Sequence, residues 1–325
     1  MSSEDRFVEA VRAMLPAGGP VVLGPGDDAA ILERDRGLLA VTTDMLVEGV
    51  DFLADETPEA IGRRAVSVNL SDLAAMGAAP EALVLAIGFR GRRGPEFPLA
   101  ITRAAAERAA DFGARVVGGD LSEAPATVVT VALWGRPAGR PLTRAGARVG
   151  DDVWISGFPG RAAAGLRIAR RGTPPSAAER DLVAAYRDPE PRVALGVALA
   201  REGIATAAID VSDGVGVDAG RVARASESRI VLERSRLPVS EALEACAARE
   251  GEDPVAWLLA GGDDYELLFT ARPSDRVRVE AGADAAGVPV TRVGRVEAGQ
   301  GAMLQDASGE RSVEEFGFDH LRSAS

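Results

Sequence analysis

The sequence predicts a two-domain protein of mixed α and β structure. Its 325 residues exceed the roughly 250–300 residues at which a single core stops growing, and 46% of them are hydrophobic, enough for two cores. Strand-like and helix-like segments alternate along the chain, and the region 135–150 interrupts them. We therefore expect an N-terminal domain over 1–137, a linker over 138–149 and a C-terminal domain over 150–325.

The N-terminal domain is predicted to be α+β, with an extensive sheet. A helix is expected over 4–15, where Ser2 or Ser3 precedes an apolar stripe at helical spacing. Thr57 and Pro58 suit the start of a second helix, which we expect to continue to Gly77. The remaining patterns predict a helix over 95–113 and strands over 20–23, 29–32, 38–43, 82–89, 114–119 and 127–135.

The C-terminal domain follows a segment rich in glycine, proline and arginine, GRPAGRPLTRAGARVG, which has neither helical nor strand periodicity. Beyond it, apolar runs alternate with alanine-rich helical segments, which is typical of an α/β domain. The expected strands cover 152–157, 204–210, 229–233, 265–270 and 288–294.

Composition excludes several classes of function. A formal net charge of −12 argues against binding to nucleic acid or to a membrane surface, since clustered basic residues bind both. The chain contains no lysine, because all 37 basic residues are arginine, so nucleotide sites built on a phosphate-binding lysine are excluded. His320 is the only histidine, which leaves no material for a Ser-His-Asp triad or a multi-histidine zinc site.

The sequence also indicates where in the cell the protein is located. The acidic start MSSEDRFVEA lacks the pattern of a secretory signal, and no apolar run approaches the ~18 residues of a membrane span. We therefore expect a cytoplasmic protein. Cys246 is the only cysteine, which excludes a disulfide within the chain.

Aspartates recur beside glycine or at the ends of predicted strands. A single Gly-Asp pair is also what an ordinary turn contains, but the repetition favours a shared role. Carboxylate oxygens are the ligands that hard cations such as Mg²⁺ prefer. The positions are Asp27, Asp28, Asp44, Asp120, Asp210, Asp213, Asp263 and Asp264.

Asp72 is a further candidate, on the helix predicted after Thr57. Ile61, Ala65 and Val68 form one stripe of that helix, and Asp72 takes the next place on it. A carboxylate on a buried face needs cations beside it, either arginines or metal ions. The stripe is equally compatible with a helix end that emerges into solvent at Asp72.

The order of the motifs resembles the thiamine-monophosphate kinase family over nearly the whole chain. The family shares its fold with aminoimidazole ribonucleotide synthetase, which implies an N-terminal domain that forms a homodimer through its sheet and a larger C-terminal α/β domain. ATP would lie between the domains, with several Mg²⁺ ions. The matching segments are GPGDDAAIL, TTDMLVEGVDF, NLSDLAAMGAAP, GGDLSEA, PLTRAGARVGDDVWISG, DVSDGVGVDAGRVA and GGDDYELLFT.

The resemblance also implies roles for individual residues. Gly119, Arg144 and Ser212 would contact ATP. Asp51, Asp263 and Phe318 would contact thiamine monophosphate, although positions 51 and 263 are His and Glu in the usual family pattern. Asp44, Asp120 and Asp213 are assigned as catalytic through metal binding. The implied metal ligands are Asp28, Thr42, Thr43, Asp44, Asp72, Asp120, Asp210 and Asp213.

The implied reaction is direct phosphoryl transfer from ATP to the phosphate of thiamine monophosphate. That acceptor is mostly dianionic at neutral pH, so no general base is needed, which agrees with a chain that has one remote histidine and no lysine. Two alternatives remain. One is another ATP-using enzyme of the same fold, and the other is a non-catalytic relative that binds nucleotide or metal.

Overall fold

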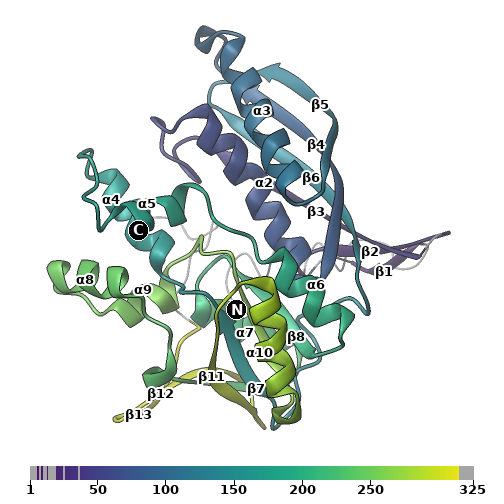
Figure 1. The fold of residues 1–325 in the computed structure, drawn as a ribbon, viewed down its shortest axis with the longest axis vertical. Coiled ribbons are helices and arrows are strands. Elements are labelled where there is room, and N and C mark those ends of the chain that lie inside the picture. Colours follow the sequence, from purple (N-terminus) through teal and green to yellow (C-terminus); the bar gives the residue numbers. More distant parts are fainter. Residues whose placement is uncertain are drawn as a thin grey trace.

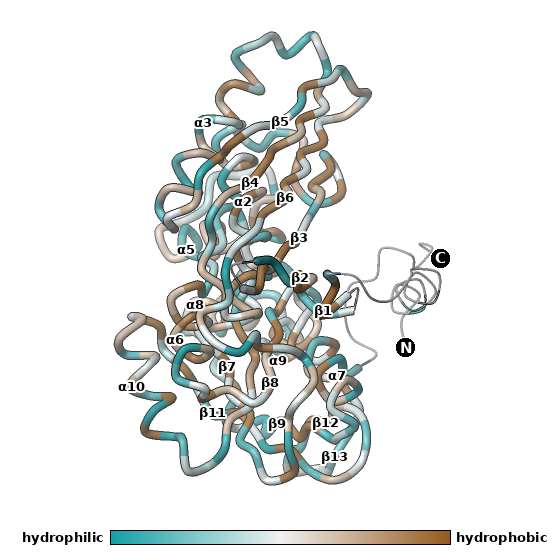
Figure 2. The backbone as a smooth tube through the Cα atoms, turned by 90° about the vertical axis from the view of Figure 1, so that its right-hand side faces the viewer, coloured by the Kyte–Doolittle hydropathy of each residue, from teal (hydrophilic) through white to brown (hydrophobic). Residues whose placement is uncertain are grey.

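The computed structural model describes Arg6, Glu9 and Ala13, residues 20–24 and 26–35, and residues 37–314. Two sheets with their helices lie one above the other along the long axis of the molecule (Figures 1 and 2). The predicted helix over 4–15 falls mainly outside the described residues, and Phe318 and His320 fall outside them entirely. No helix in the described part of the chain is long and apolar enough to cross a bilayer.

The first unit is a six-stranded sheet in the order β1-β2-β3-β6-β4-β5, in which only the β4–β5 pair is parallel. Helices α2 and α3 belong to this unit. The bounds are β1 Val21–Leu23, β2 Ala30–Arg34, β3 Gly37–Val47, α2 Pro58–Ala75, β4 Ala78–Phe89, α3 Glu96–Asp111, β5 Arg115–Glu123 and β6 Val128–Pro137.

The second unit is a seven-stranded mixed sheet in the order β13-β12-β9-β11-β7-β10-β8, and α7, α9 and α10 are among its helices. The bounds are β7 Asp152–Ser156, α4 Arg161–Arg170, α5 Arg180–Arg187, α6 Val193–Arg201, β8 Ala205–Val211, α7 Val215–Ala225, β9 Arg229–Glu233, α8 Glu241–Glu250, α9 Pro254–Ala260, β10 Glu266–Ala271, α10 Arg276–Ala286, β11 Val290–Glu297, β12 Gly301–Asp306 and β13 Gly309–Ser312.

Helix α2 begins where the sequence predicts. The Thr57 hydroxyl accepts a hydrogen bond from the Ala60 amide at 3.2 Å, and Pro58 occupies the first helical turn. Gly77, with a φ of 64°, follows the end of the helix in the left-handed conformation that glycine adopts most easily.

Two strands run further than predicted, so Asp44 and Asp120 do not end them. Strand β3 continues from Asp44 to Val47 because Met45 to Val47 keep their pairing with β6. Strand β5 continues from Asp120 to Glu123 because it remains paired with β4. The hairpin β12–β13 was not predicted, since all four residues of β13 are exposed and carry no apolar alternation.

One hydrophobic core is shared by the two units, and two further apolar clusters lie within the second unit. Helix α2 is buried on almost all sides, because it packs against β3, β4 and β6 of the first sheet and against α6, β8 and β10 of the second unit. A Cβ atom on Gly196 of α6 would lie 1.9 Å from the carbonyl oxygen of Ala74 on α2, so only glycine permits this approach. Side chains on α2 therefore face both units.

Candidate functional site: an acidic cavity between the two sheets

A cavity of about 540 Å³ lies where α2 meets the second unit, and we call it the acidic cavity. Strand β3 supplies one wall, and the segments that follow β8 and α9 supply another. Its acidic lining residues are Asp44, Asp51, Asp72, Asp210, Asp213 and Asp263. Six of the sequence-predicted aspartates thus meet in one place.

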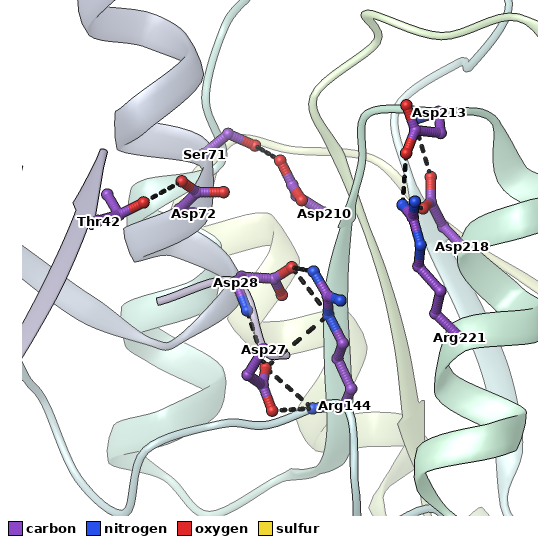
Figure 3. Close-up of polar contacts among 10 residues, drawn as sticks. All are labelled: Asp27, Asp28, Thr42, Ser71, Asp72, Arg144, Asp210, Asp213, Asp218 and Arg221. Carbon is purple, nitrogen blue, oxygen red and sulfur yellow. Dashed lines mark hydrogen bonds and ion pairs between the residues drawn. The ribbon is translucent and has the colours of Figure 1, made fainter. Parts of the chain in front are cut away.

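Three aspartates from separate segments converge at its edge, where two of them, Asp72 and Asp210, line it. Asp28 lies before β2, Asp72 near the end of α2 and Asp210 in β8, and one carboxylate oxygen of each lies within 4.8 Å of the others. The Thr42 hydroxyl donates to Asp72 Oδ2 at 2.5 Å, and the Ser71 hydroxyl donates to Asp210 Oδ2 at 2.7 Å (Figure 3). We call Asp28, Asp72 and Asp210 the carboxylate cluster.

The electrostatics of this cluster suit a cation. Burial is the main cause that raises the pKa of Asp72, and the charges of Asp44, Asp210 and Asp28 raise it further. Burial likewise raises the pKa of Asp210, with Asp28 as the next cause. Asp28 Oδ2 is buried without a hydrogen-bond partner. An unpartnered carboxylate oxygen and a donor set made only of oxygens fit a hard divalent cation.

Arg144 supplies positive charge at the edge of the cluster. Its guanidinium donates to Asp28 Oδ1, with Nε at 3.1 Å, and its backbone amide donates to Asp27 Oδ2 at 3.1 Å (Figure 3). Burial raises the pKa of Asp27 to about 7, the Asp28 charge adds to the increase and Arg144 opposes it. The sequence-predicted nucleotide contact Arg144 therefore holds the loop that carries Asp28.

Asp213 and Asp44 lie beside the cluster rather than within it. Arg221 Nη1 donates to Asp213 Oδ2 at 2.5 Å and to Asp218 Oδ1 at 2.8 Å (Figure 3). Burial raises the pKa of Asp218 to about 7, although Arg221 opposes the increase. The Asp44 amide donates to Asn69 Oδ1 at 3.1 Å, and burial is the first cause that raises the pKa of the Asp44 carboxyl.

Strand register separates Thr43 and Asp120 from the cluster. Thr42 contacts Asp72, so the next residue, Thr43, faces the other side of the sheet, and its hydroxyl donates to the Val131 carbonyl at 2.8 Å. Thr43 is paired with Ala132, and Asp120 is paired with Ala86. Ala132 and Ala86 lie on the same face of the sheet as Thr43, so Asp120 lies on that face too. Asp120 is exposed there. The described chain does not bring these two predicted ligands to the cluster.

The remaining predicted nucleotide contacts occupy different places. Ser212 lines the acidic cavity, directly after β8. Gly119 lies on the edge strand β5, where a Cβ atom would approach the Leu85 carbonyl oxygen to 2.1 Å, so glycine is required by the backbone. Gly119 is not among the residues that line the cavity.

The two residues that depart from the family pattern both have intramolecular partners. Asp51 Oδ2 accepts a hydrogen bond from the Val47 amide at 2.8 Å, at the end of β3. Asp263 Oδ1 lies 2.8 Å from Arg64 Nη2 and accepts from the Tyr265 hydroxyl at 3.1 Å. Asp263 has a φ of 69°, and its ion pair and the hydrogen bond from its amide to the Ser212 carbonyl hold that strained conformation.

Sequence reasoning missed Arg64 and the apolar end of the cavity. The Arg64 guanidinium is buried on α2 and lies over the Tyr186 ring at 4.9 Å from its centre. At the far end of the cavity, Leu166 and Trp257 form an apolar wall, and Arg167 stacks on the Trp257 ring at 4.4 Å. Trp257 lies in an ordinary apolar helix sequence, PVAWLLA, so no local pattern marks it.

Comparisons with known proteins identify the family. The N-terminal domain model of AIR synthase related proteins matches residues 26–136, and the C-terminal domain model matches residues 148–306. Thiamine-monophosphate kinase of Escherichia coli K12 is 36% identical over 310 residues, which cover 93% of this chain and 92% of the relative.

Solved structures agree with this assignment. The structure described as AaThiL complexed with AMPPCP and TMP has a TM-score of 0.85 at 29% identity, covering 98% of this chain and 96% of that one. Thiamine-monophosphate kinase from Stenotrophomonas maltophilia has a TM-score of 0.77 at 35% identity, covering 94% and 97%. The chain therefore belongs to the thiamine-monophosphate kinase family of AIR synthase related proteins.

Proposed function

We propose that this chain is a Mg²⁺-dependent kinase that transfers the γ-phosphoryl group of ATP to the phosphate of thiamine monophosphate. The observation that carries the proposal is the carboxylate cluster at the edge of the acidic cavity, in a chain that matches a thiamine-monophosphate kinase over 93% of its length. The relative solved with AMPPCP and TMP supports the same pair of substrates.

Asp28, Asp72 and Asp210 would hold the metal, with Asp44 and Asp213 beside them. Mg²⁺ suits an all-oxygen site that leaves positions for phosphate oxygens and water. Bound there, it would offset the repulsion between the two polyanionic substrates and stabilise charge on the leaving ADP.

The chain's own side chains would orient the substrates. Arg144 presents a guanidinium beside Asp28, where it can pair with phosphate oxygens. No proton needs to be removed from a dianionic acceptor, so the reaction requires no general base among the residues that line the cavity. Leu166 and Trp257 offer an apolar surface for the heterocycle of thiamine monophosphate, and Asp51 and Asp263 are its proposed polar contacts, while Ser212 is proposed to contact ATP. Phe318 lies outside the described residues, and its contact with thiamine monophosphate is proposed from the sequence.

We further propose that the protein is a homodimer in which Asp120, Thr43 and Gly119 act across the subunit interface. In one chain, the face of the first sheet that carries Thr43 and Asp120 also exposes Met45 and Val84, at 58% and 37%. A second copy that covers this face would bury these apolar side chains and bring Asp120 beside the partner. A monomeric mass at micromolar concentration would contradict this part of the proposal.

An ADP-release assay tests the activity. The enzyme is incubated with ATP and Mg²⁺ in the presence of thiamine monophosphate, of thiamine, or of buffer alone. We expect ADP release to depend on thiamine monophosphate and on Mg²⁺. ATP binding without release that depends on thiamine monophosphate would overturn the proposal in favour of a non-catalytic relative.

A further inference from the structure

A second cavity, of about 460 Å³, opens on the segment that joins the two units, and we call it the linker cavity. Residues 140–143 and 145–148 form one wall, the start of β8 forms another, and the end of α7 closes it. It shares no lining residue with the acidic cavity, and the two lie toward opposite ends of β8, at Thr206 and Asp210. Its volume falls within the ~300–1,000 Å³ typical of small-molecule sites.

The charge of the linker cavity is opposite to that of the whole chain. Three exposed arginines line it, Arg140, Arg148 and Arg272. None of the three makes an ion pair or a side-chain hydrogen bond with any described residue. Glu227 is the only acidic residue that lines it. A concave surface with excess positive charge, in a chain of net charge −12, concentrates a local positive potential that attracts anions.

The backbone of the linker cavity is held in place. The Ser226 hydroxyl accepts hydrogen bonds from the amides of Gly146 and Ala147, both at 3.1 Å, and donates to the Arg144 carbonyl at 3.0 Å. A Cβ atom on Gly146 would lie 2.3 Å from the Thr206 carbonyl oxygen, so the segment packs closely on β8. The backbone next to Arg148 is therefore held in place, which lowers the entropy lost when a ligand binds against this segment.

We propose that the linker cavity is a second binding site, separate from the acidic cavity, for a small anion that carries phosphate groups. The planar guanidinium groups of Arg140, Arg148 and Arg272 match phosphate oxygens in geometry and charge. The ligand would lie against the same backbone segment that carries Arg144, whose side chain and amide hold Asp28 and Asp27. This proposal does not depend on the identity of the reaction.

Titration calorimetry with inorganic pyrophosphate tests the proposal on the full-length protein in EDTA. Without divalent cations the carboxylate cluster repels pyrophosphate, so binding reports on the linker cavity. We expect saturable binding of one pyrophosphate per chain that weakens as salt increases. The double variant Arg148→Gln/Arg272→Gln should weaken binding by more than about tenfold, because two charge-assisted contacts are lost.

Arg180→Gln is the matched control, because Arg180 is an exposed arginine on α5 that lines neither cavity. It should bind pyrophosphate like the wild type. If the double variant does not fold, as judged by circular dichroism, Arg272→Gln alone replaces it. The absence of saturable binding, equal binding by wild type and variant, or an equal loss in Arg180→Gln would overturn the proposal.

Discussion

At the scale of single residues, neighbours decide which aspartates are available to a metal ion. Asp72 and Asp210 accept hydrogen bonds from hydroxyl groups, which do not neutralise their negative charge. Asp213 and Asp263 pair with Arg221 and Arg64. Asp28 pairs with Arg144 through Oδ1, but its Oδ2 accepts no hydrogen bond and stays available. All five sit near glycine or strand ends in the sequence, or on a helix stripe, and most of their partners come from other parts of the fold.

Replacement of Asp72 should lower the activity without lowering the stability of the fold. Asp72→Asn removes a proposed metal ligand, so we expect the rate of ADP release to fall by about a hundredfold or more. The amide oxygen still accepts from Thr42, and one negative charge beside Asp28 and Asp210 is lost, so stability in EDTA should be unchanged or higher. Steady-state kinetics and urea unfolding measure the two effects.

The exposed residue Asp181 on α5 provides the control, because Asp181→Asn makes the same chemical change away from the cavity. It should leave both measurements unchanged. Near-normal turnover of Asp72→Asn at limiting Mg²⁺ would rule out the metal role.

Arg64 is predicted to position Asp263 at the acceptor end of the cavity. Arg64→Met leaves Asp263 without its cation, which should lower the free energy of unfolding by roughly 2–5 kcal/mol, toward the lower end because Asp263 is partly solvated. The KM for thiamine monophosphate should rise while the KM for ATP stays unchanged. Urea unfolding and steady-state kinetics measure both quantities.

The adjacent residue offers a comparison on the same helix. Arg63 is half-buried and pairs with Asp188 at 2.7 Å, outside the acidic cavity, so Arg63→Met should cost less than about 1 kcal/mol and leave both KM values unchanged. Equal behaviour of the two variants would mean that Arg64 has no positioning role.

At the scale of elements, the alternation of strands β3 and β5 divides the predicted metal ligands into two groups. Thr42 and Asp44 face α2, whereas Thr43 and Asp120 face the uncovered side of the sheet. Residues that are adjacent in a strand point to opposite faces, so one chain cannot direct all of them at one cation. A site that uses both groups requires a second copy of the chain.

This division predicts complementation between two inactive variants. In a dimer where Asp120 serves the partner's site, mixing Asp72→Asn with Asp120→Asn gives heterodimers that contain one intact and one doubly defective site. If half of the dimers are mixed, about a quarter of the wild-type activity should return. ADP release after denaturation and joint refolding measures it.

The control mixture is Asp72→Asn with Asp210→Asn. Both residues belong to the cluster of a single chain, so each site of the mixed dimer lacks one ligand and activity should stay at the level of the separate variants. Recovery in this control, or none in the Asp72 and Asp120 mixture, would contradict the shared site.

At the scale of the whole molecule, two units that share a core enclose acidic groups, and this makes stability depend on pH. The pKa of Asp27 is raised from 3.8 to about 7, mainly by burial, so above pH 4 the folded state holds this proton more tightly than the unfolded state. The contribution of Asp27 therefore favours folding at low pH and is lost as the pH rises toward 7. Without metal, this part of the stability falls across that window.

Asp27→Asn should remove that contribution. In EDTA, the free energy of unfolding from urea titrations should fall less steeply between pH 4 and 7 in the variant than in the wild type, because the side-chain amide carries no titratable proton. In the proposed function Mg²⁺ binds the carboxylate cluster of the folded state, so it should raise the wild-type melting temperature more at pH 8 than at pH 5, where protons compete. Equal slopes in variant and wild type would contradict the titration of Asp27.

The sequence by itself determined the classes of element and the chemistry of the site. Local rules suffice for α2, where Thr57 and Pro58 mark the start and Gly77 the end. The lack of lysine and the recurrent aspartates left oxygen ligands, arginines and backbone amides as the means to bind phosphate. Both conclusions rest on composition or on residues near one another in the chain, which is why a linear pattern contains them.

Only the tertiary structure decided which of these residues meet. Asp28, Asp72 and Asp210 converge because α2 is packed between two sheets, and Arg64 reaches Asp263 through the same packing. Strand register, which depends on pairing partners, separated Asp120 from Asp44 although both follow similar local sequences. Contacts between distant segments depend on how whole elements pack, and local propensity carries no information about that packing.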